Sequence, residues 1–225
     1  MEFLFDTANI AEIKKCGDIY PYTGVTSNPS ILKPEGAVDF FGHFRQIRGI
    51  IGPDRSLHIQ VVAEDSHTMV KEAEKILEMV DDKVSIKIPT TEEGLKAMQI
   101  LKGKGATITA TAIYTKFQGM LAIAAGADYI APYYNRMESQ DIYADHTIIA
   151  LAQVINSKRL NCKILAASFK NTGQVMAAIT AGAHAVTVLP ELLNEGLDLP
   201  FVAKSVGNFT KSWQSVYGSR GILDM

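Results

Sequence analysis

Short runs rich in Val, Ile, Phe and Thr alternate along this chain with longer segments of helical periodicity, and no other feature constrains the fold as strongly. The runs predicted to be strands are residues 2–6, 24–28, 57–63, 84–89, 107–112, 129–133, 163–168 and 185–189. The helices predicted between them are residues 10–19, 40–51, 67–80, 92–102, 115–125, 146–157 and 172–181. Strict alternation predicts a parallel sheet, and eight strands favour its closure into a single (β/α)8 barrel, the TIM barrel.

The alternative architecture is an open, doubly wound parallel sheet. Such sheets often carry GxGxxG after the first strand or a GxxxxGK[ST] loop, and neither motif occurs in this chain. Two passages, LAIAAGADYIAP (121–132) and MAAITAGAHAVTVLP (176–190), share a helix, an Ala-Gly-Ala turn and a strand, which fits a repeated α/β unit. Because no Pro- or Ser-rich linker interrupts the chain, we expect residues 1–225 to form one domain.

The chain continues beyond the eighth predicted strand. Residues 190–197 are followed by a long helical pattern, so that residues 199–220 are predicted to form an additional C-terminal helix. Its apolar residues fall roughly on one face, and these are Phe201, Val202, Val206, Phe209, Trp213 and Val216. A barrel does not need this helix, which packs either on its own barrel or on a neighbouring subunit.

The composition argues against several classes of partner. The net charge is -2, and acidic and basic residues are interspersed along the chain. Proteins that bind nucleic acids or membrane surfaces usually carry a basic stripe instead. Two distant cysteines, Cys16 and Cys162, make no disulfide framework, so a reducing compartment is expected. The N-terminal MEFLFDTAN lacks the pattern of a signal peptide, and no apolar run is long enough to span a membrane. We therefore expect a cytoplasmic protein.

The fourth predicted strand contains a lysine that should face the inside of the barrel. Side chains alternate between the two faces of a strand, so the apolar residues of VSIKIP (84–89) should contact the helices. Ser85 and Lys87 should then point inward. Burial disfavours the ammonium form of a lysine, and the free amine is the form that attacks a carbonyl group. Alternatively, Lys87 lies at the strand mouth and reaches water or a salt-bridge partner.

Other predicted strands also place a polar residue at or near their C-terminal ends, where barrel enzymes keep their active sites. Ordinary barrel interiors are dominated by branched apolar residues, so the coincidence predicts a polar site at this rim. Its predicted lining residues are Asp6, Asn28, Gln60, Lys87, Thr111, Tyr133 and Ser168. Asp6 has a competing structural role, as the N-cap of the helix that follows.

Two cations follow the sixth and seventh predicted strands, Arg136 and Lys170. With the Ser168 hydroxyl and the N-terminus of the helix that starts near Thr172, they form a candidate phosphate site. The alternative is that both are solvated surface charges.

These residues stand in motifs that resemble the small transaldolase family and, within it, the fructose-6-phosphate aldolase-like branch. The motifs are DTAN (6–9), GVTSNPS (24–30), IKIPTTEEGL (86–95), TATAIYTKFQG (109–119), APYYNR (131–136) and LAASFK (165–170). They follow one another over nearly the whole chain, and they are specific.

The resemblance implies a role for each predicted site residue. Lys87 would form a Schiff base with the ketose carbonyl, and Asp6 would handle protons and position hydroxyl groups. Asn28 would hydrogen-bond the bound ketose, and Ser168 would line the pocket. The implied partners are sugar-phosphate substrates. No cofactor and no metal are expected, because the iminium ion replaces a Lewis acid and no Cys/His spacing suggests a metal site.

The resemblance also bears on the phosphate and on the subtype. Arg136 and Lys170 match the positions where the family grips the substrate phosphate. Transaldolases proper usually carry Glu in the third strand and Phe in the sixth, whereas this chain has Gln60 and Tyr133, as the aldolase branch does. In that branch the tyrosine hydroxyl, with a water held by Gln60 and Thr111, is the implied acid–base group.

One segment departs from the pattern of the family. After Arg136 the chain reads MESQDIYAD (137–145) where other members have a Gly-containing loop, so the preference for donor and acceptor is not carried over. The family often assembles through its C-terminal helix into decamers of two pentameric rings, which implies a homo-oligomer.

The leading hypothesis is therefore a Schiff-base aldolase that cleaves or forms the C3–C4 bond of ketose phosphates, with fructose 6-phosphate giving dihydroxyacetone and glyceraldehyde 3-phosphate. The first alternative is a transaldolase that transfers a dihydroxyacetone unit between sugar phosphates in the pentose phosphate pathway. A sugar-phosphate isomerase or epimerase would use Asp6 and Tyr133 for proton transfer and Lys87 only as a charge. A non-catalytic sugar-phosphate-binding protein would tolerate Lys87→Met.

Overall fold

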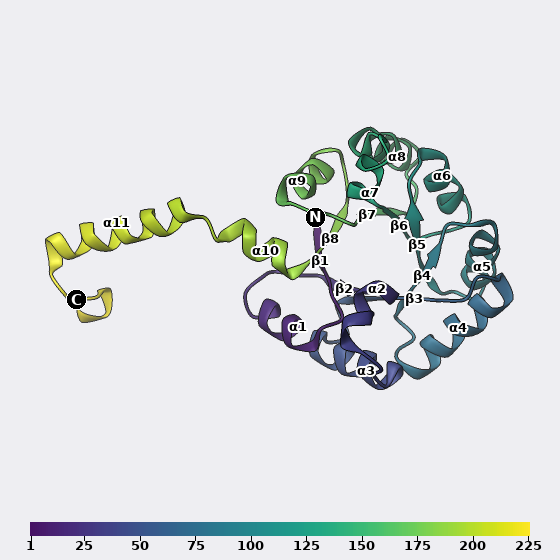
Figure 1. Cartoon of the computed structure of the whole chain (residues 1–225), viewed down its shortest axis with the longest axis horizontal. Helices are drawn as coiled ribbons and strands as arrows, with labels where there is room; N and C mark the ends of the chain where they lie inside the picture. Colours follow the sequence, from purple (N-terminus) through teal and green to yellow (C-terminus); the bar gives the residue numbers. More distant parts are fainter.

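The computed structural model describes residues 1–225, and its strands close into one barrel in the order β1 to β8 (Figure 1). Every neighbouring pair is parallel, including the pair of β1 and β8 that closes the sheet. The strands are β1 (Glu2–Asp6), β2 (Gly24–Thr26), β3 (Ser56–Gln60), β4 (Ser85–Pro89), β5 (Thr107–Ile113), β6 (Tyr129–Pro132), β7 (Lys163–Ala166) and β8 (Ala185–Val188). The predicted (β/α)8 barrel is confirmed.

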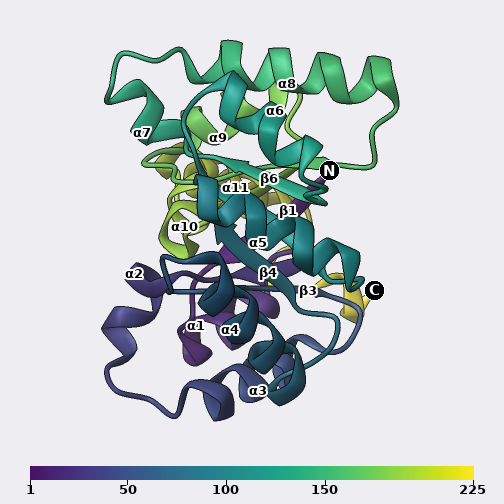
Figure 2. The same cartoon turned by 90° about the vertical axis from the view of Figure 1, so that its right-hand side faces the viewer.

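Helices surround this barrel, and α3 and α8 cover opposite sides of it (Figure 2). The helices are α1 (Ile10–Gly17), α2 (Pro29–Leu32), α3 (Phe40–Ile51), α4 (Ser66–Met79), α5 (Glu92–Gly103), α6 (Lys116–Ala124), α7 (Tyr134–Glu138), α8 (Ala144–Lys158), α9 (Thr172–Thr180), α10 (Pro190–Leu197) and α11 (Pro200–Tyr217). Short 3-10 turns lie at Lys33–Glu35 and Ile222–Asp224.

The main hydrophobic core lies between the outer face of the barrel and the helices. Val84, Ile86 and Ile88 belong to it and are fully buried, as the alternation along β4 predicts. Inside the barrel, Leu4, Leu165 and Ala185 form a separate small apolar cluster, against which Tyr129 packs. The remaining interior is largely polar, and this polar interior contains the site.

Several strands end earlier than predicted, and in β2 and β3 the reason is that the next backbone groups bond to side chains. β2 stops at Thr26, and the Asn28 side chain accepts the backbone N–H groups of Ser30 and Ile31 at the start of α2. Pro29 at the first helical position suits that start, since it has no N–H to leave unpaired. The prediction of strand for residues 61–63 is also wrong, because the Glu72 carboxylate accepts the N–H groups that follow Val61.

The structure also corrects the segment after the sixth strand. β6 ends at Pro132, and Tyr133 is the N-cap of the helix α7, which the sequence pattern did not predict. Residues 137–145 are therefore no continuous loop: Met137 and Glu138 end α7, and α8 begins at Ala144 rather than at residue 146. The backbone N–H of Tyr134 donates to Ala167 O, which ties α7 to the end of β7.

Helix α11 extends away from the barrel (Figure 1), and none of its residues is buried. Its apolar face contacts no other part of the chain that would cover it, so packing of this helix on its own barrel is not observed. No helix combines the length and apolar character that crossing a lipid bilayer requires.

Candidate active site

Lys87 lies on the inner face of β4, with 3% of its surface exposed. The strand register places Lys87 beside Gln60 of β3 and Thr109 of β5. Ser85, two residues earlier, shares the inner face, since its hydroxyl lies 2.7 Å from Thr109 Oγ1. Lys87 is therefore enclosed by the barrel rather than directed at the helices or at bulk water.

Asp6 ends β1 on the same inner face. The Thr26 hydroxyl donates to Asp6 Oδ1 over 2.9 Å, and the Thr26 hydroxyl also lies 2.6 Å from that of Thr187 on β8. Burial raises the pKa of Asp6, while the charge of nearby Lys87 and the bond from Thr26 act in the opposite direction. The N-cap of α1 is Asn9, so Asp6 does not have the competing capping role.

Thr111 and Tyr133 meet at the mouth, with their hydroxyl oxygens 2.9 Å apart. The register between β5 and β6 shifts between Ala110 and Ile113, which is a β-bulge, and Ala112 has a φ of 57°. A left-handed conformation is costly for a residue with a Cβ, and bulges of this kind redirect side chains at barrel rims. The bulge therefore sets the direction of Thr111 at the end of β5.

Arg136 stacks on Tyr133, with its guanidinium carbon 4.8 Å from the ring centroid. Its Nη1 donates to the hydroxyl of Tyr114 over 3.4 Å, and the rings of Tyr114 and Tyr133 pack edge to face at 5.7 Å. A hollow beside this group is lined by Tyr114, Arg136, Ser139, Gln140 and Ile142. The two tyrosines thus orient the guanidinium at the rim.

Ser168 and Lys170 lie on the segment that follows β7. Ser168 has a φ of 64°, and its carbonyl accepts the backbone N–H of Asn135 in α7. Lys170 is exposed, and its backbone N–H donates to Gln174 Oε1. The bridge between Tyr133 and Ala167 brings this segment to the Tyr133 side of the mouth, but no ion pair or hydrogen bond joins the Lys170 side chain to the protein.

Gln60 and Asn28 border a groove beside the mouth, between α2, α3 and α4. The Oε1 atom of Gln60 is buried and has no hydrogen-bond partner in the protein. Asn28 uses its Oδ1 atom to cap α2, which fixes the side chain and leaves its amide N–H groups available to a ligand. The groove has a largely apolar wall that includes Leu32, Phe40, Phe41, Val61 and Val62.

The predicted set leaves out Thr26 and Tyr114, which contact its members, and Thr187, which contacts Thr26. Thr26 donates to Asp6 and bonds to Thr187, and the Tyr114 hydroxyl accepts from Arg136. Alternation would have placed Thr187 on the inner face, since Val186 and Val188 of β8 belong to the outer core. No pattern in the sequence signals the contact of Tyr114, because a register shift and a helix bring the two segments together.

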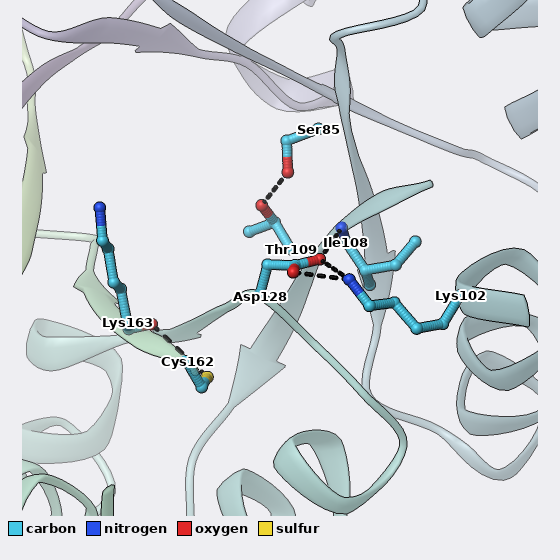
Figure 3. A network of polar contacts seen from close by, with 7 residues as sticks. All are labelled: Ser85, Lys102, Ile108, Thr109, Asp128, Cys162 and Lys163. Atoms are coloured by element: carbon cyan, nitrogen blue, oxygen red, sulfur yellow. Dashed lines mark hydrogen bonds and ion pairs between the residues drawn. The ribbon is translucent and has the colours of Figure 1, made fainter. Parts of the chain in front are cut away.

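Both cysteines are free and buried. Burial raises the pKa of Cys162 to about 12, which keeps the thiol protonated near neutral pH. Its neighbour Asp128 is bound to Lys102 and to the N–H of Ile108 (Figure 3), a structural link between α5, β5 and β6. No group of three or more His, Cys, Asp or Glu side chains is arranged to hold a metal ion.

A closed (β/α)8 barrel with a buried lysine and a partly buried carboxyl group toward the C-terminal ends of its strands defines the class of barrel enzymes, which keep their active sites at that end. The transaldolase/fructose-6-phosphate aldolase family model matches residues 3–219. A curated relative from Streptococcus pneumoniae, named "Probable fructose-6-phosphate aldolase", is 47% identical over 222 residues, covering 99% of this chain and 100% of the relative. The chain belongs to the transaldolase/fructose-6-phosphate aldolase family, as the sequence motifs predicted.

Proposed function

We propose that the protein is a Schiff-base aldolase that cleaves and forms the C3–C4 bond of ketose phosphates, with fructose 6-phosphate as substrate and dihydroxyacetone and glyceraldehyde 3-phosphate as products. The observation that carries the proposal is Lys87, buried on the inner face of β4 next to Gln60 and near Asp6. The name of the relative from S. pneumoniae supports this choice of substrate.

The reaction begins when the free amine of Lys87 attacks the C2 carbonyl carbon of the ketose. The resulting carbinolamine loses water to give an iminium ion, which withdraws electrons from the C3–C4 bond. That bond breaks when the C4 hydroxyl is deprotonated, and the C4 fragment leaves as an aldehyde. Asp6 is suited to exchange protons in these steps, because it lies near Lys87 and burial raises the pKa of its carboxyl group.

The enamine that remains on Lys87 has two fates. Protonation at C3 and hydrolysis release dihydroxyacetone, which is the aldolase reaction, whereas attack on a second aldehyde is the transaldolase reaction. A phenol can donate a proton where a phenyl ring cannot, so Tyr133, held by Thr111 at 2.9 Å, favours release. The free Oε1 atom of Gln60 supports a water-mediated proton path beside Lys87. Transfer to a second aldehyde remains the alternative activity.

The phosphate of the substrate is assigned to the rim between β6 and β7. Arg136 is fixed there by Tyr133 and Tyr114, and an oriented guanidinium suits a phosphate group. Ser168 and the exposed Lys170 precede the N-terminus of α9, which favours an anion. Asn28, from the opposite side of the mouth, is assigned to the hydroxyl groups of the ketose.

Helix α11, within the single barrel domain of residues 1–225, is assigned to the interface between copies of this chain in a homo-oligomer. Its exposed apolar residues include Phe201, Val206, Phe209 and Val216, each more than half exposed. A single copy has nothing to cover that face. The expected assembly is a decamer of two pentameric rings, and native mass spectrometry that found only monomers would contradict it.

Borohydride trapping tests the proposed chemistry directly. Reduction in the presence of fructose 6-phosphate should link the dihydroxyacetone unit covalently to Lys87, and peptide mass spectrometry should find it on no other lysine. Lys83, exposed just before β4, offers the matched control: Lys83→Arg should still form the adduct and Lys87→Arg should not. An adduct on another lysine, or none, would overturn the proposal. Turnover with and without erythrose 4-phosphate then separates cleavage from transfer.

A further inference from the structure

Beneath Lys87 the interior of the barrel carries a layer of polar side chains, where most barrels have branched apolar residues. We call this layer the polar floor, and its members are Ser56 and His58 of β3, Ser85 of β4 and Thr109 of β5. Ser85 lies two residues before Lys87 on the same strand, and His58 is the register partner of Ser85. Ser85 and His58 therefore occupy the next inward-facing position below Lys87, and Thr109 lies beside it.

One continuous chain of hydrogen bonds joins the polar floor. The Ser56 hydroxyl lies 3.1 Å from His58 Nε2, and His58 Nδ1 lies 2.8 Å from Thr109 Oγ1. Thr109 Oγ1 also lies 2.7 Å from the hydroxyl of Ser85, a contact that Figure 3 shows between the two strands. Since Thr109 is the register partner of Lys87 on β5, the chain of hydrogen bonds passes directly beside the lysine before it ends at Ser85.

The polar floor has no net charge. His58 is fully buried, and burial, followed by the charges of Lys87 and Arg48, lowers the pKa of His58 to about 3. The imidazole is therefore uncharged near neutral pH, with each ring nitrogen paired to a hydroxyl group. A carboxylate at this place would favour the ammonium form of a neighbouring lysine, which cannot attack a carbonyl group.

The imidazole is also fixed by packing. Its ring meets that of Tyr129 nearly at right angles, with centroids 5.1 Å apart. Tyr129 in turn packs against the apolar cluster of Leu4, Leu165 and Ala185 inside the barrel. His58 thus connects this packed cluster to the polar floor under Lys87.

We propose that His58 is a positioning residue for Lys87, because the polar floor that it holds together supports the lysine side chain and keeps the amine at one height in the barrel mouth. This inference rests on the proposed role of Lys87 as the Schiff-base residue. His58 does not touch the substrate in this proposal. It acts through Thr109, and a displacement of reacting atoms by about 1 Å can cost two orders of magnitude in rate.

Two substitutions of His58 separate hydrogen bonding from packing. His58→Phe keeps a ring against Tyr129 but removes both hydrogen bonds, whereas His58→Gln keeps a donor and an acceptor. Ile59→Val is the matched control, because Ile59 is the next residue on β3, is equally buried and belongs to the outer core. The measurements are the rate of formation of the borohydride-trapped adduct on Lys87, kcat and KM with fructose 6-phosphate, and the melting temperature.

His58→Phe should slow adduct formation and lower kcat by about tenfold to a hundredfold, with KM changed less than about threefold. His58→Gln should recover most of the lost rate, and Ile59→Val should react at about the wild-type rate. An adduct that forms on His58→Phe at the wild-type rate would overturn the inference, as would a rate that follows the melting temperature across all three variants.

Thr109→Val provides a second route if His58→Phe fails to fold. This substitution removes the hydrogen bond between Thr109 and His58 with little change in side-chain shape. The same fall in the rate of adduct formation is expected. An unchanged rate for Thr109→Val would overturn the inference. If the wild-type protein forms no adduct on Lys87, the proposed function itself fails. If the wild type and the variants form the adduct at the same rate, only the inference about His58 fails.

Discussion

The two faces of the closed sheet differ more than any other two regions of this molecule. On β4 the outward residues Ile86 and Ile88 are fully buried in the core under the helices, whereas the inward residues are Ser85 and Lys87. The outer face is held by apolar packing and the inner face by hydrogen bonds between side chains of different strands. Neighbouring residues on one strand therefore face different environments, an apolar core on the outside and a hydrogen-bonded interior on the inside.

The same division runs through β5, where Ile108 and Ala110 join the outer core while Thr109 and Thr111 bond across the interior. If the division is real, substitutions on the outer face should lower stability with little effect on catalysis. Substitutions on the inner face should lower catalysis with little effect on stability. His58 is the exception, because its substitution is expected to change both.

The largest effect is expected from Lys87→Met. Loss of the amine removes the covalent step, so kcat/KM should fall by about ten-thousandfold or more. The melting temperature should not fall, because methionine fills a similar volume without a buried polar end. Turnover of fructose 6-phosphate and calorimetry check both parts, and more than about 1% residual activity would contradict the assignment of Lys87.

His58 provides the next largest effect, on the pH dependence of stability. Its pKa falls from 6.5 to about 3 in the folded protein, so between these values the unfolded chain binds a proton here and the folded chain does not. Stability should therefore decrease as the pH falls through this window, by on the order of 5 kcal/mol in total. His58→Gln should flatten the decrease, and urea unfolding at several pH values checks it; parallel curves for the two proteins would contradict it.

Ile86→Ala tests the outer face of the same strand as Lys87. Removing a fully buried side chain leaves a cavity, and the free energy of unfolding should fall by about 3 kcal/mol. Because Ile86 points away from the site, kcat/KM measured well below the melting temperature should stay within about threefold of wild type. A loss of activity comparable to that of an inner-face variant would break the division.

Tyr133→Phe has the smallest expected effect. It tests whether one inner-face hydroxyl group affects cleavage more than transfer. It removes the hydroxyl bonded to Thr111, so cleavage of fructose 6-phosphate should fall by about tenfold to a hundredfold. Transfer to erythrose 4-phosphate, which needs no protonation of the enamine, should fall less. Tyr143→Phe, at an exposed position, serves as the control, and an equal loss of both reactions in Tyr133→Phe would contradict the role of the hydroxyl.

Much of the fold and part of the site could be predicted from local patterns. The alternation of strands and helices gave the barrel, and the period of two along 84–89 placed Lys87 inside it. Two of the segments predicted wrongly are ones whose backbone groups bond to side chains. Asn28 caps α2 instead of extending β2. After β3, the Glu72 carboxylate accepts hydrogen bonds from the backbone N–H groups of Val62 and Ala63.

The sequence by itself determined which residues alternate, and therefore that a lysine and several hydroxyl groups face away from the helices. The tertiary structure alone decided which of them meet. Thr111 reaches Tyr133 through a bulge, and His58 reaches Thr109, 51 residues away, through strand register and closure of the sheet. The reason is physical: alternation is a property of consecutive residues, whereas register and closure depend on packing over the whole barrel.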